Sequence, residues 1–432
     1  MRTDRRAEPS PILAAARRHI VQGALNNGVR FALWPDDTDS VATVHVWVRA
    51  GSGVEQRGAT GLAHMLEHLM FRGTSAVPDG VFDARMEALG AQINAATWVD
   101  YTCYTTTAPP EAIGEVIALE ADRFGGLDLT EEVFAAERSV VANERRQVID
   151  SVPEARLGEH LHHLAFGEGP YGHPTIGWAE DIEGYTREAV LGFLERWYAP
   201  GELLVVVVGA FAPAAVVEHL EATFGGLSAG PEGERRRGSR FIGAGVHELR
   251  VPVPTPRVHV AWPAPGRGEP GWATWALLEA ILGGGDGSRL PMRLEVDEPL
   301  VLDVGTHLYP HAMEQLMEVD LTVRLGVDPE RVLGALDEAL EALATDGPTE
   351  EEVLAASRRL RMLDAGALAP TAGRASRMGE SWVTFGDAGT DFGLVDEMRQ
   401  VRGEDVRALA GRLCEGLPRL VLHGVPTGEE DA

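Results

Sequence analysis

The feature that most restricts the fold is an order of elements that occurs twice along the chain. "HIVQGALNNGVRFALWP" predicts two strands around Asn26-Asn27-Gly28, because an Asn-Gly turn between apolar runs is a strong hairpin signal. A Val/Thr-rich strand and a helix over residues 60–71 follow. Later, "HELRVPVPTPRVHVAWPAP" again predicts a strand pair, and "GWATWALLEAILGGG" again predicts a helix. We interpret this recurrence as an internal duplication.

The expected fold class is therefore α+β, with two homologous α/β-sandwich halves that each pack a mostly antiparallel sheet against helices. The first half covers residues 19–224 and the second covers residues 246–427. Residues 225–245, "GGLSAGPEGERRRGSRFIGAG", are rich in glycine and charge and have no apolar period, which indicates a linker. Residues 1–18 are expected to form an N-terminal tail.

Composition restricts the partners and the location. The 66 Asp and Glu against 38 Lys and Arg give a formal charge of −28, which argues against a nucleic acid as the main partner, because binding phosphates requires a positive surface. No segment approaches the apolar length of a membrane span. Two cysteines, Cys103 and Cys414, are too few for a disulfide framework, and the N-terminal segment lacks the apolar run of a secretion signal. We therefore expect a cytoplasmic protein.

The helix predicted over residues 60–71 carries His64, Glu67 and His68 in the pattern "HMLEH". On an α-helix these side chains project from nearly one face, because residues three and four apart are neighbours. Two imidazoles one turn apart can share a zinc ion, and the carboxylate between them can take a proton from water that the metal activates. The alternative is a helix with solvent-facing polar residues, since so short a pattern also occurs by chance.

A further acidic ligand is available on the helix predicted over residues 130–149, "TEEVFAAERSVVANERRQVI". Glu137 and Glu144 are seven residues apart, so both lie on one helical face, and apolar residues flank that face. Carboxylates beside a core need partners or a cation. The alternative is that both glutamates pair with neighbouring arginines on a solvated face.

The second half keeps only part of the polar pattern. Aligned by eye, "HMLEH" falls on "ALLEA", residues 276–280. Glu279 occupies the position of Glu67, whereas alanine occupies both histidine positions. The second half is therefore expected to lack the metal site.

The pattern His64-x-x-Glu67-His68, with Glu144 farther along the chain, resembles the pitrilysin/insulinase family of zinc metallopeptidases, which are inverzincins. The segments "HMLEHLMFRGT", "EALGAQINAATWVDYTCY", "ERSVVANE", "YGHPTIG" and "WYAPGELLVVVVG" are similar to segments of that family, in the same order. Over residues 19–425, the chain looks most similar to the bacterial peptidases of the mitochondrial-processing-peptidase subfamily.

The resemblance implies roles for individual residues. It makes His64, His68 and Glu144 the ligands of a zinc cofactor. It makes Glu67 the general base, and it makes Glu137 a residue that supports the catalytic site from outside the ligand set.

The resemblance also implies how a substrate binds. Asn94 and Ala95, in "INAAT", match edge-strand residues that hold a peptide in an extended conformation by strand addition. Members of this family enclose peptides or small unfolded chains between two bowl-like halves, so we expect a zinc-dependent endopeptidase. Two alternatives remain open, a maturation protease for one peptide precursor and a catalytically silent scaffold subunit of the same fold.

One departure from the family concerns an Arg and a Tyr that follow the segment matching "SRL". In this register the Arg position is Glu295 and the Tyr position is Leu302. The pair holds the substrate and stabilises the oxyanion in the family, a task for preorganised donors. Its absence predicts a zinc-bearing subunit that is completed by a homologous partner, with a homodimer as the other arrangement. A local insertion that shifts the register is the alternative.

Overall fold

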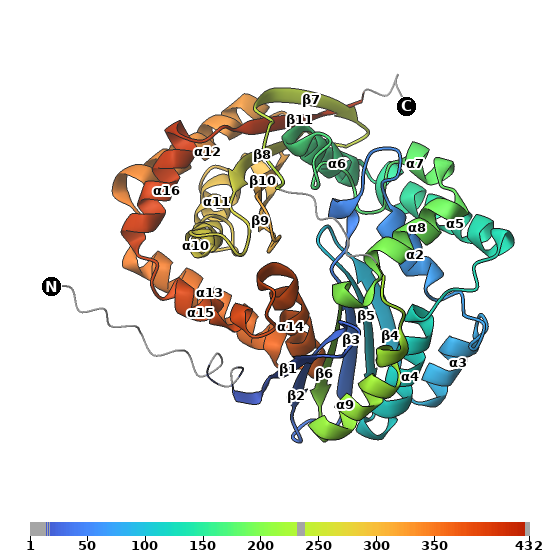
Figure 1. The fold of residues 1–432 in the computed structure, drawn as a ribbon. Coiled ribbons are helices and arrows are strands. Elements are labelled where there is room, and N and C mark those ends of the chain that lie inside the picture. Colours follow the sequence, from blue (N-terminus) through green and yellow to red (C-terminus); the bar gives the residue numbers. More distant parts are fainter. Residues whose placement is uncertain (1–13, 15, 17, 231–237, 428–432) are drawn as a thin grey trace.

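Two sheets form the centres of the two halves (Figure 1). The computed structural model describes residues 14, 16, 18–230 and 238–427 of the 432. The first sheet has the strand order β1-β2-β6-β3-β5-β4, and the second has the order β7-β11-β8-β10-β9. The strands are β1 (Val21–Ala24), β2 (Arg30–Pro35), β3 (Ala42–Val48), β4 (Gln92–Thr97), β5 (Thr102–Ala108), β6 (Leu203–Gly209), β7 (Gly245–Val251), β8 (Arg257–Ala264), β9 (Val301–Leu308), β10 (Gln315–Val323) and β11 (Leu420–Pro426).

The helices surround these sheets and connect their strands (Figure 1). The helices of the first half are α2 (Leu62–Leu69), α3 (Val81–Ala88), α4 (Ile113–Phe124), α5 (Glu131–Arg145), α6 (Pro153–Phe166), α7 (Ala179–Gly184), α8 (Arg187–Trp197) and α9 (Pro213–Ala222). Those of the second half are α10 (Trp272–Leu282), α11 (Arg289–Pro291), α12 (Pro329–Asp346), α13 (Glu350–Leu368), α14 (Thr371–Phe385), α15 (Leu394–Met398) and α16 (Gly403–Glu415).

The two sheets share one topology, as a duplication predicts. The order β2-β6-β3-β5-β4 corresponds to β7-β11-β8-β10-β9, and in each sheet the first of these pairs is parallel and the others are antiparallel. The hairpin predicted around Asn27 forms, with Val21 of β1 opposite Leu33 of β2. By contrast, β7 and β8 do not pair with each other, because β11 lies between them. The duplicated strands are therefore β2 and β3 rather than the hairpin.

The central strands of each sheet are buried on both faces, and a helix from the opposite half covers one of these faces (Figure 1). Along β6, Val205 and Val207 join the core of the first half, whereas Val206 and Val208 face α14 of the second half. On α14, Trp382 is 1% exposed, and the guanidinium of Arg49 lies 3.9 Å from its ring centre. The two halves therefore complete each other's packing.

The reciprocal contact is made by α6 of the first half, which packs on the second sheet. Leu157 and Leu161 of α6 share a buried cluster with Ala261 of β8 and Leu422 of β11. The predicted linker approaches the same helix, since Ile242 N donates to Ala165 O at 2.8 Å.

Parts of the predicted tail and linker lie outside the described residues. These are residues 1–13, 15 and 17 of the tail and residues 231–237 of the linker. Ala16, within the predicted tail, is fully buried in the cluster that contains Trp382.

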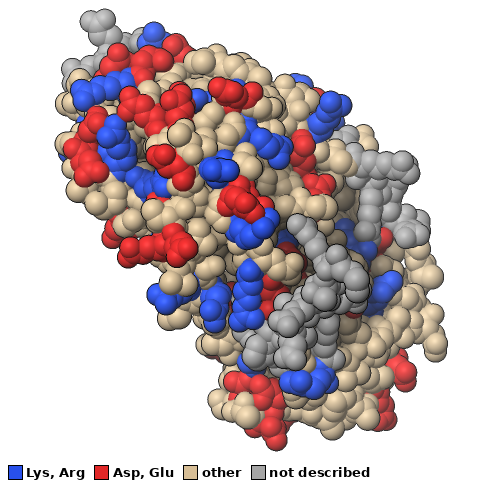
Figure 2. Space-filling model, turned by 90° about the vertical axis from the view of Figure 1, so that its left-hand side faces the viewer, with Lys and Arg blue, Asp and Glu red and all other residues tan. Residues whose placement is uncertain are grey.

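The surface carries charges of both signs. Figure 2 shows acidic and basic side chains interspersed over the face that α12, α13, α15 and α16 present, so Lys and Arg do not form a continuous basic surface there. None of the helices in the described ranges combines the length and the apolar composition needed to cross a bilayer.

Candidate metal centre

Helices α2 and α5 bring two imidazoles and one carboxylate together. Glu144 Oε2 lies 3.3 Å from His68 Nε2 and 3.8 Å from His64 Nε2. One donor atom from each of the three residues lies within 4.8 Å of the others. Within residues 14, 16, 18–230 and 238–427, no other set of three His, Cys, Asp or Glu side chains converges in this way. The helical spacing of "HMLEH" and the approach of α5 thus produce a three-residue donor set.

The hydrogen bonds around these side chains leave suitable atoms free for a metal. His68 Nδ1 lies 2.9 Å from Glu137 Oε1 and donates to it, so the lone pair of His68 is on Nε2, which faces Glu144. Glu144 Oε2 is buried and accepts no hydrogen bond from the described residues. A buried carboxylate oxygen without a donor is costly unless a cation binds it. The residues therefore fit a divalent ion such as zinc, which binds imidazole nitrogen and carboxylate oxygen.

The electrostatics of the histidines are compatible with metal binding. Burial, and then the neighbouring His68, lower the pKa of His64 to about 3, so this ring is neutral, as a ligand must be. Burial opposes protonation of His68 as well. However, the hydrogen bond with Glu137 and the charges of Glu144 and Glu67 raise its pKa overall. The acidic groups around His68 thus create a site that attracts positive charge.

Glu67 is connected to the edge strand β4. Thr97 Oγ1, at the end of β4, donates to Glu67 Oε2 at 2.5 Å. Burial raises the pKa of the Glu67 carboxyl although this hydrogen bond lowers it, and a raised pKa suits a general base that works near neutral pH. Asn94 and Ala95 lie in β4, the outermost strand of the first sheet. The predicted base therefore lies against the strand that is predicted to hold the substrate.

Glu137 lies behind His68. Its side chain is 4% exposed, and it accepts hydrogen bonds from His68 Nδ1 and, at 2.6 Å, from Arg72 Nε. Burial would raise its pKa, but the hydrogen bonds from His68 and Arg72 lower the pKa overall. A carboxylate in this position fixes the tautomer and orientation of a ligand histidine. This geometry agrees with a supporting role for Glu137, which stays a prediction.

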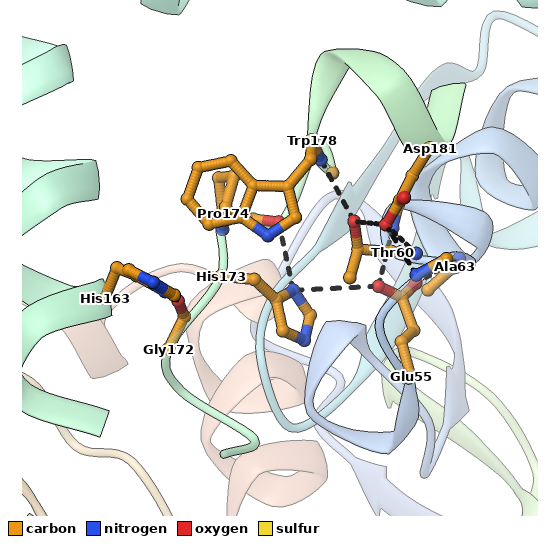
Figure 3. Close-up of polar contacts among 12 residues, drawn as sticks. Glu55, Thr60, Ala63, His163, Gly172, His173, Pro174, Trp178 and Asp181 are labelled. Carbon is orange, nitrogen blue, oxygen red and sulfur yellow. Dashed lines mark hydrogen bonds and ion pairs between the residues drawn. The ribbon is translucent and has the colours of Figure 1, made fainter. Parts of the chain in front are cut away.

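A buried polar network holds the start of α2 (Figure 3). The fully buried carboxylate of Glu55 accepts hydrogen bonds from Gly61 N and Ala63 N at 2.6 and 2.7 Å, and His173 Nδ1 lies 3.9 Å from it. Asp181 accepts from the backbone N and the hydroxyl of Thr60 at 3.1 and 2.6 Å. Acidic groups stabilise a helix N-terminus, so this network fixes the helix that carries the two histidines.

Glu55, Thr97 and Asp181 are not predicted from the sequence. Glu55 lies in the loop before α2, which begins at Leu62. Thr97 ends β4 and Asp181 belongs to α7, so both contact the α2 region from other elements. The local sequence signal for Glu55 is an acidic residue shortly before a predicted helix. This signal is weak, because the conformation of the intervening loop decides whether the carboxylate reaches the helix N-terminus.

The second half has the corresponding carboxylate without the ligands. Glu279 Oε1, on α10, accepts a hydrogen bond from Thr306 Oγ1 of the edge strand β9 at 2.7 Å. Ala276 and Ala280 are buried apolar residues. The carboxylate–threonine pair therefore occurs twice, but the imidazoles occur only in the first half.

The two positions that are predicted to depart from the family, Glu295 and Leu302, offer no donor side chain. Glu295 Oε1 accepts a hydrogen bond from Val304 N at 3.1 Å, and Leu302 of β9 is 52% exposed. The nearby Arg293 pairs with Glu298 and Glu338, both at 2.8 Å.

Comparison with known proteins places the chain in a family. The sequence profile "Insulinase (Peptidase family M16)" matches residues 30–178, and "Peptidase M16 inactive domain" matches residues 184–360. An uncharacterized zinc protease of Mycobacterium tuberculosis is 30% identical over 421 residues, which cover 94% of this chain and 92% of that protein. The chain belongs to peptidase family M16, the insulinase family.

A second relative and a solved structure are also similar to this chain, and the structure supports the predicted fold class. A probable mitochondrial-processing peptidase subunit beta of Arabidopsis thaliana is 28% identical over 311 residues; the match covers 68% of this chain and 58% of that protein. The crystal structure of a protease from Helicobacter pylori matches with a TM-score of 0.88 at 24% identity, covering 94% of this chain and 99% of that one. The expected architecture of two sheet-and-helix halves is thereby confirmed.

Proposed function

We propose that this M16 protein is a zinc-dependent endopeptidase that hydrolyses peptides or small unfolded polypeptides. The observation that carries the proposal is the convergence of His64, His68 and Glu144, with Glu67 on the same face of α2. The zinc-protease name of the Mycobacterium tuberculosis relative supports zinc as the metal.

In this proposal the first half performs the chemistry. A bound zinc ion would lower the pKa of its water ligand to about 7 and polarise the substrate carbonyl. Glu67 takes the proton of the attacking water at the oxygen that Thr97 does not occupy, and then gives it to the leaving amine. Strand β4 holds the peptide extended at Asn94 and Ala95, through backbone hydrogen bonds.

We further propose that a homologous partner completes the active site. By the family resemblance, Glu295 and Leu302 occupy the positions of the Arg and Tyr that stabilise the oxyanion. An ionised carboxylate only accepts hydrogen bonds, and a leucine side chain has no polar group, so neither residue can donate one to the oxyanion. The relative from Arabidopsis is named as a subunit. Loss of one oxyanion donor costs about 10²–10³ in rate, so the chain alone should be slow.

A single assay tests both proposals. The zinc-loaded chain is assayed on a quenched fluorescent unfolded peptide, alone and with any homologous chain that copurifies with it. We expect slow hydrolysis by the chain alone, loss of that activity on chelation and its return with zinc. A partner that carries the Arg and Tyr should raise the rate by about 10²-fold or more. Hydrolysis that survives complete metal removal would refute the zinc mechanism, and full activity of the chain alone would refute the need for a partner.

We also propose a cytoplasmic location. Cys103 is buried and Cys414 is exposed, and both are free thiols. A reducing compartment keeps an exposed thiol in that state.

A further inference from the structure

The loop between α6 and α7, residues 167–178, contacts both helices that carry the candidate metal ligands. Its second part has the sequence "YGHPTIGW" and ends at Trp178, directly before α7. One side of this loop touches the residues that precede α2, and the other side touches the end of α5. The loop is therefore placed to fix the distance between the two helices.

The contact with the start of α2 is close and depends on two glycines. Trp178 N donates a hydrogen bond to Thr60 Oγ1 at 3.0 Å (Figure 3). Gly61 and Gly177 both have φ of +89°, which favours glycine. A Cβ atom on Gly61 would overlap Ile176 O, and one on Gly177 would overlap Thr60 O. The two backbone segments thus touch directly, so the loop cannot move without moving the start of α2.

The contact with α5 is made by one side chain, that of Arg145. Its Nη1 donates a hydrogen bond to Gly177 O at 2.6 Å, and its guanidinium carbon lies 5.8 Å from the ring centre of Trp178. Arg145 directly follows Glu144, the candidate ligand on α5. The same two loop residues therefore contact both the start of α2 and the neighbour of Glu144.

Arg145 is itself held in a buried ion pair. The residue is 5% exposed, its Nη2 donates to Glu159 Oε1 at 3.1 Å, and its Nη1 lies 3.0 Å from Glu159 Oε2. Its Nε lies 3.4 Å from Asp150 Oδ1. Two-pronged pairing of a guanidinium with a carboxylate fixes orientation as well as distance. The guanidinium is therefore a rigid connection between α5, α6 and the loop.

Glu144 needs such a connection because of its place in α5. It lies in the last turn of α5 (Glu131–Arg145), and the chain continues as a π-helical turn over Arg146–Asp150. Helix ends are less constrained than helix interiors. Glu144 Oε2 accepts no hydrogen bond from the described residues, so the position of this last turn decides where the oxygen lies.

The other end of α2 has its own connection to α5. Glu137 accepts hydrogen bonds from His68 Nδ1 and Arg72 Nε, at the end of α2 and just beyond it. Arg145 and the loop provide the corresponding connection at the beginning of α2. Together they hold α2 to α5 at both ends, with His64 between them.

We propose that Arg145 is a positioning residue of the metal centre. It holds the last turn of α5 against Gly177 and Trp178, so that Glu144 approaches the two histidines of α2. The inference rests on the proposed zinc centre and adds a residue that sets the geometry of that centre without binding the metal.

Replacing Arg145 with glutamine tests the proposal. Glutamine is too short to bond Gly177 O and Glu159 together, so Glu144 should lose its fixed position. We expect zinc affinity to fall by about 10–100-fold, the range for outer-shell partners of metal ligands. Titration with a competing chelator measures this loss, and circular dichroism confirms that the variant is folded. Arg145→Lys keeps the charge but not the planar fork, so its loss of affinity should be smaller.

Substitution of Co²⁺ for zinc distinguishes positioning from a general loss of stability. The visible absorption bands of Co²⁺ depend on its coordination geometry. At saturating Co²⁺ the Arg145→Gln chain should still show bands that differ from those of the native chain, because Glu144 remains displaced. A variant that is only less stable would show native bands once the metal is saturating.

Arg187 offers a matched control on the same helix. Its Nε donates to Leu129 O at 2.6 Å, beside the N-cap residue Thr130 of α5. Arg187→Gln therefore removes an arginine–carbonyl hydrogen bond of the same length at the opposite end of α5. Zinc affinity and the Co²⁺ spectrum should stay native in this variant.

Thr60→Val tests the same connection from the side of α2. It keeps the shape of the side chain but removes the hydroxyl that accepts from Trp178 N. Zinc affinity should fall, and its combination with Arg145→Lys should cost less than the sum of the two single losses, because both act through one loop. These two variants decide the question if Arg145→Gln does not fold.

Folded Arg145 variants with native zinc affinity and a native Co²⁺ spectrum would overturn the proposal. So would an equal loss in Arg187→Gln, or fully additive losses in the double variant. A native chain that binds no zinc would instead refute the proposed function, so the two failures are distinguishable.

Discussion

Replacing Glu67 with glutamine is expected to abolish peptide hydrolysis and to leave zinc bound. The substitution keeps the size of the side chain, and an amide oxygen can still accept the hydrogen bond from Thr97. The ligands His64, His68 and Glu144 are untouched. Only the basic oxygen is lost, and general acid–base catalysis contributes about 10²–10⁴-fold to such rates. The rate should therefore fall by this factor at an unchanged metal content, measured by mass spectrometry of the metal.

The chain contains a matched control for this variant. Glu279 accepts the same kind of hydrogen bond, from Thr306 at 2.7 Å, and lies on the corresponding helix of the second half. Because no histidine accompanies it on α10, Glu279→Gln should leave hydrolysis unchanged. A metal-replete Glu67→Gln chain that turns over at the normal rate would remove Glu67 from the mechanism.

Replacing Glu144 with alanine is expected to lower zinc affinity strongly. The variant removes one of three converging donors, and the loss of an outer-shell partner alone typically costs 10–100-fold in affinity. Losing a direct ligand should therefore weaken zinc binding by more than about 100-fold. Titration of the zinc-loaded chain with a competing chelator measures the zinc affinity. The rate of peptide hydrolysis should fall together with that affinity.

Glu132→Ala is the control for this second substitution. Glu132 lies on the same helix, α5, but it is exposed in the first turn and far along the helix from Glu144. This variant should bind zinc normally. A Glu144→Ala chain with unchanged stoichiometry and affinity would show that Glu144 is not a ligand.

The local part of the site could be predicted from the sequence because a helix converts spacing directly into geometry. His64, Glu67 and His68 share a face for that reason alone. The approach of Glu144 could not be predicted in this way, because two separate elements must pack before the carboxylate reaches the imidazoles, and only the resemblance to a family indicated it. The contacts of Glu55 and Thr97 are also tertiary and have no sequence period.

The fold shows the same division between local and long-range information. The hairpin around Asn27 depends on a local turn signal and is present. The position of β11 between β7 and β8 depends on the last strand of the chain returning to the sheet, which no local pattern encodes. Likewise, the apolar residues of α6 and α14 predict that each helix is buried, but they do not indicate that each one packs on the sheet of the opposite half.

Anomalous diffraction at the zinc absorption edge, from crystals of the zinc-loaded chain, tests the central claim most directly. We expect one strong peak bonded to Nε2 of His64, Nε2 of His68 and a carboxylate oxygen of Glu144, at about 2.0–2.2 Å from each. A zinc peak held by other residues, or no peak at these three at saturating zinc, would contradict it.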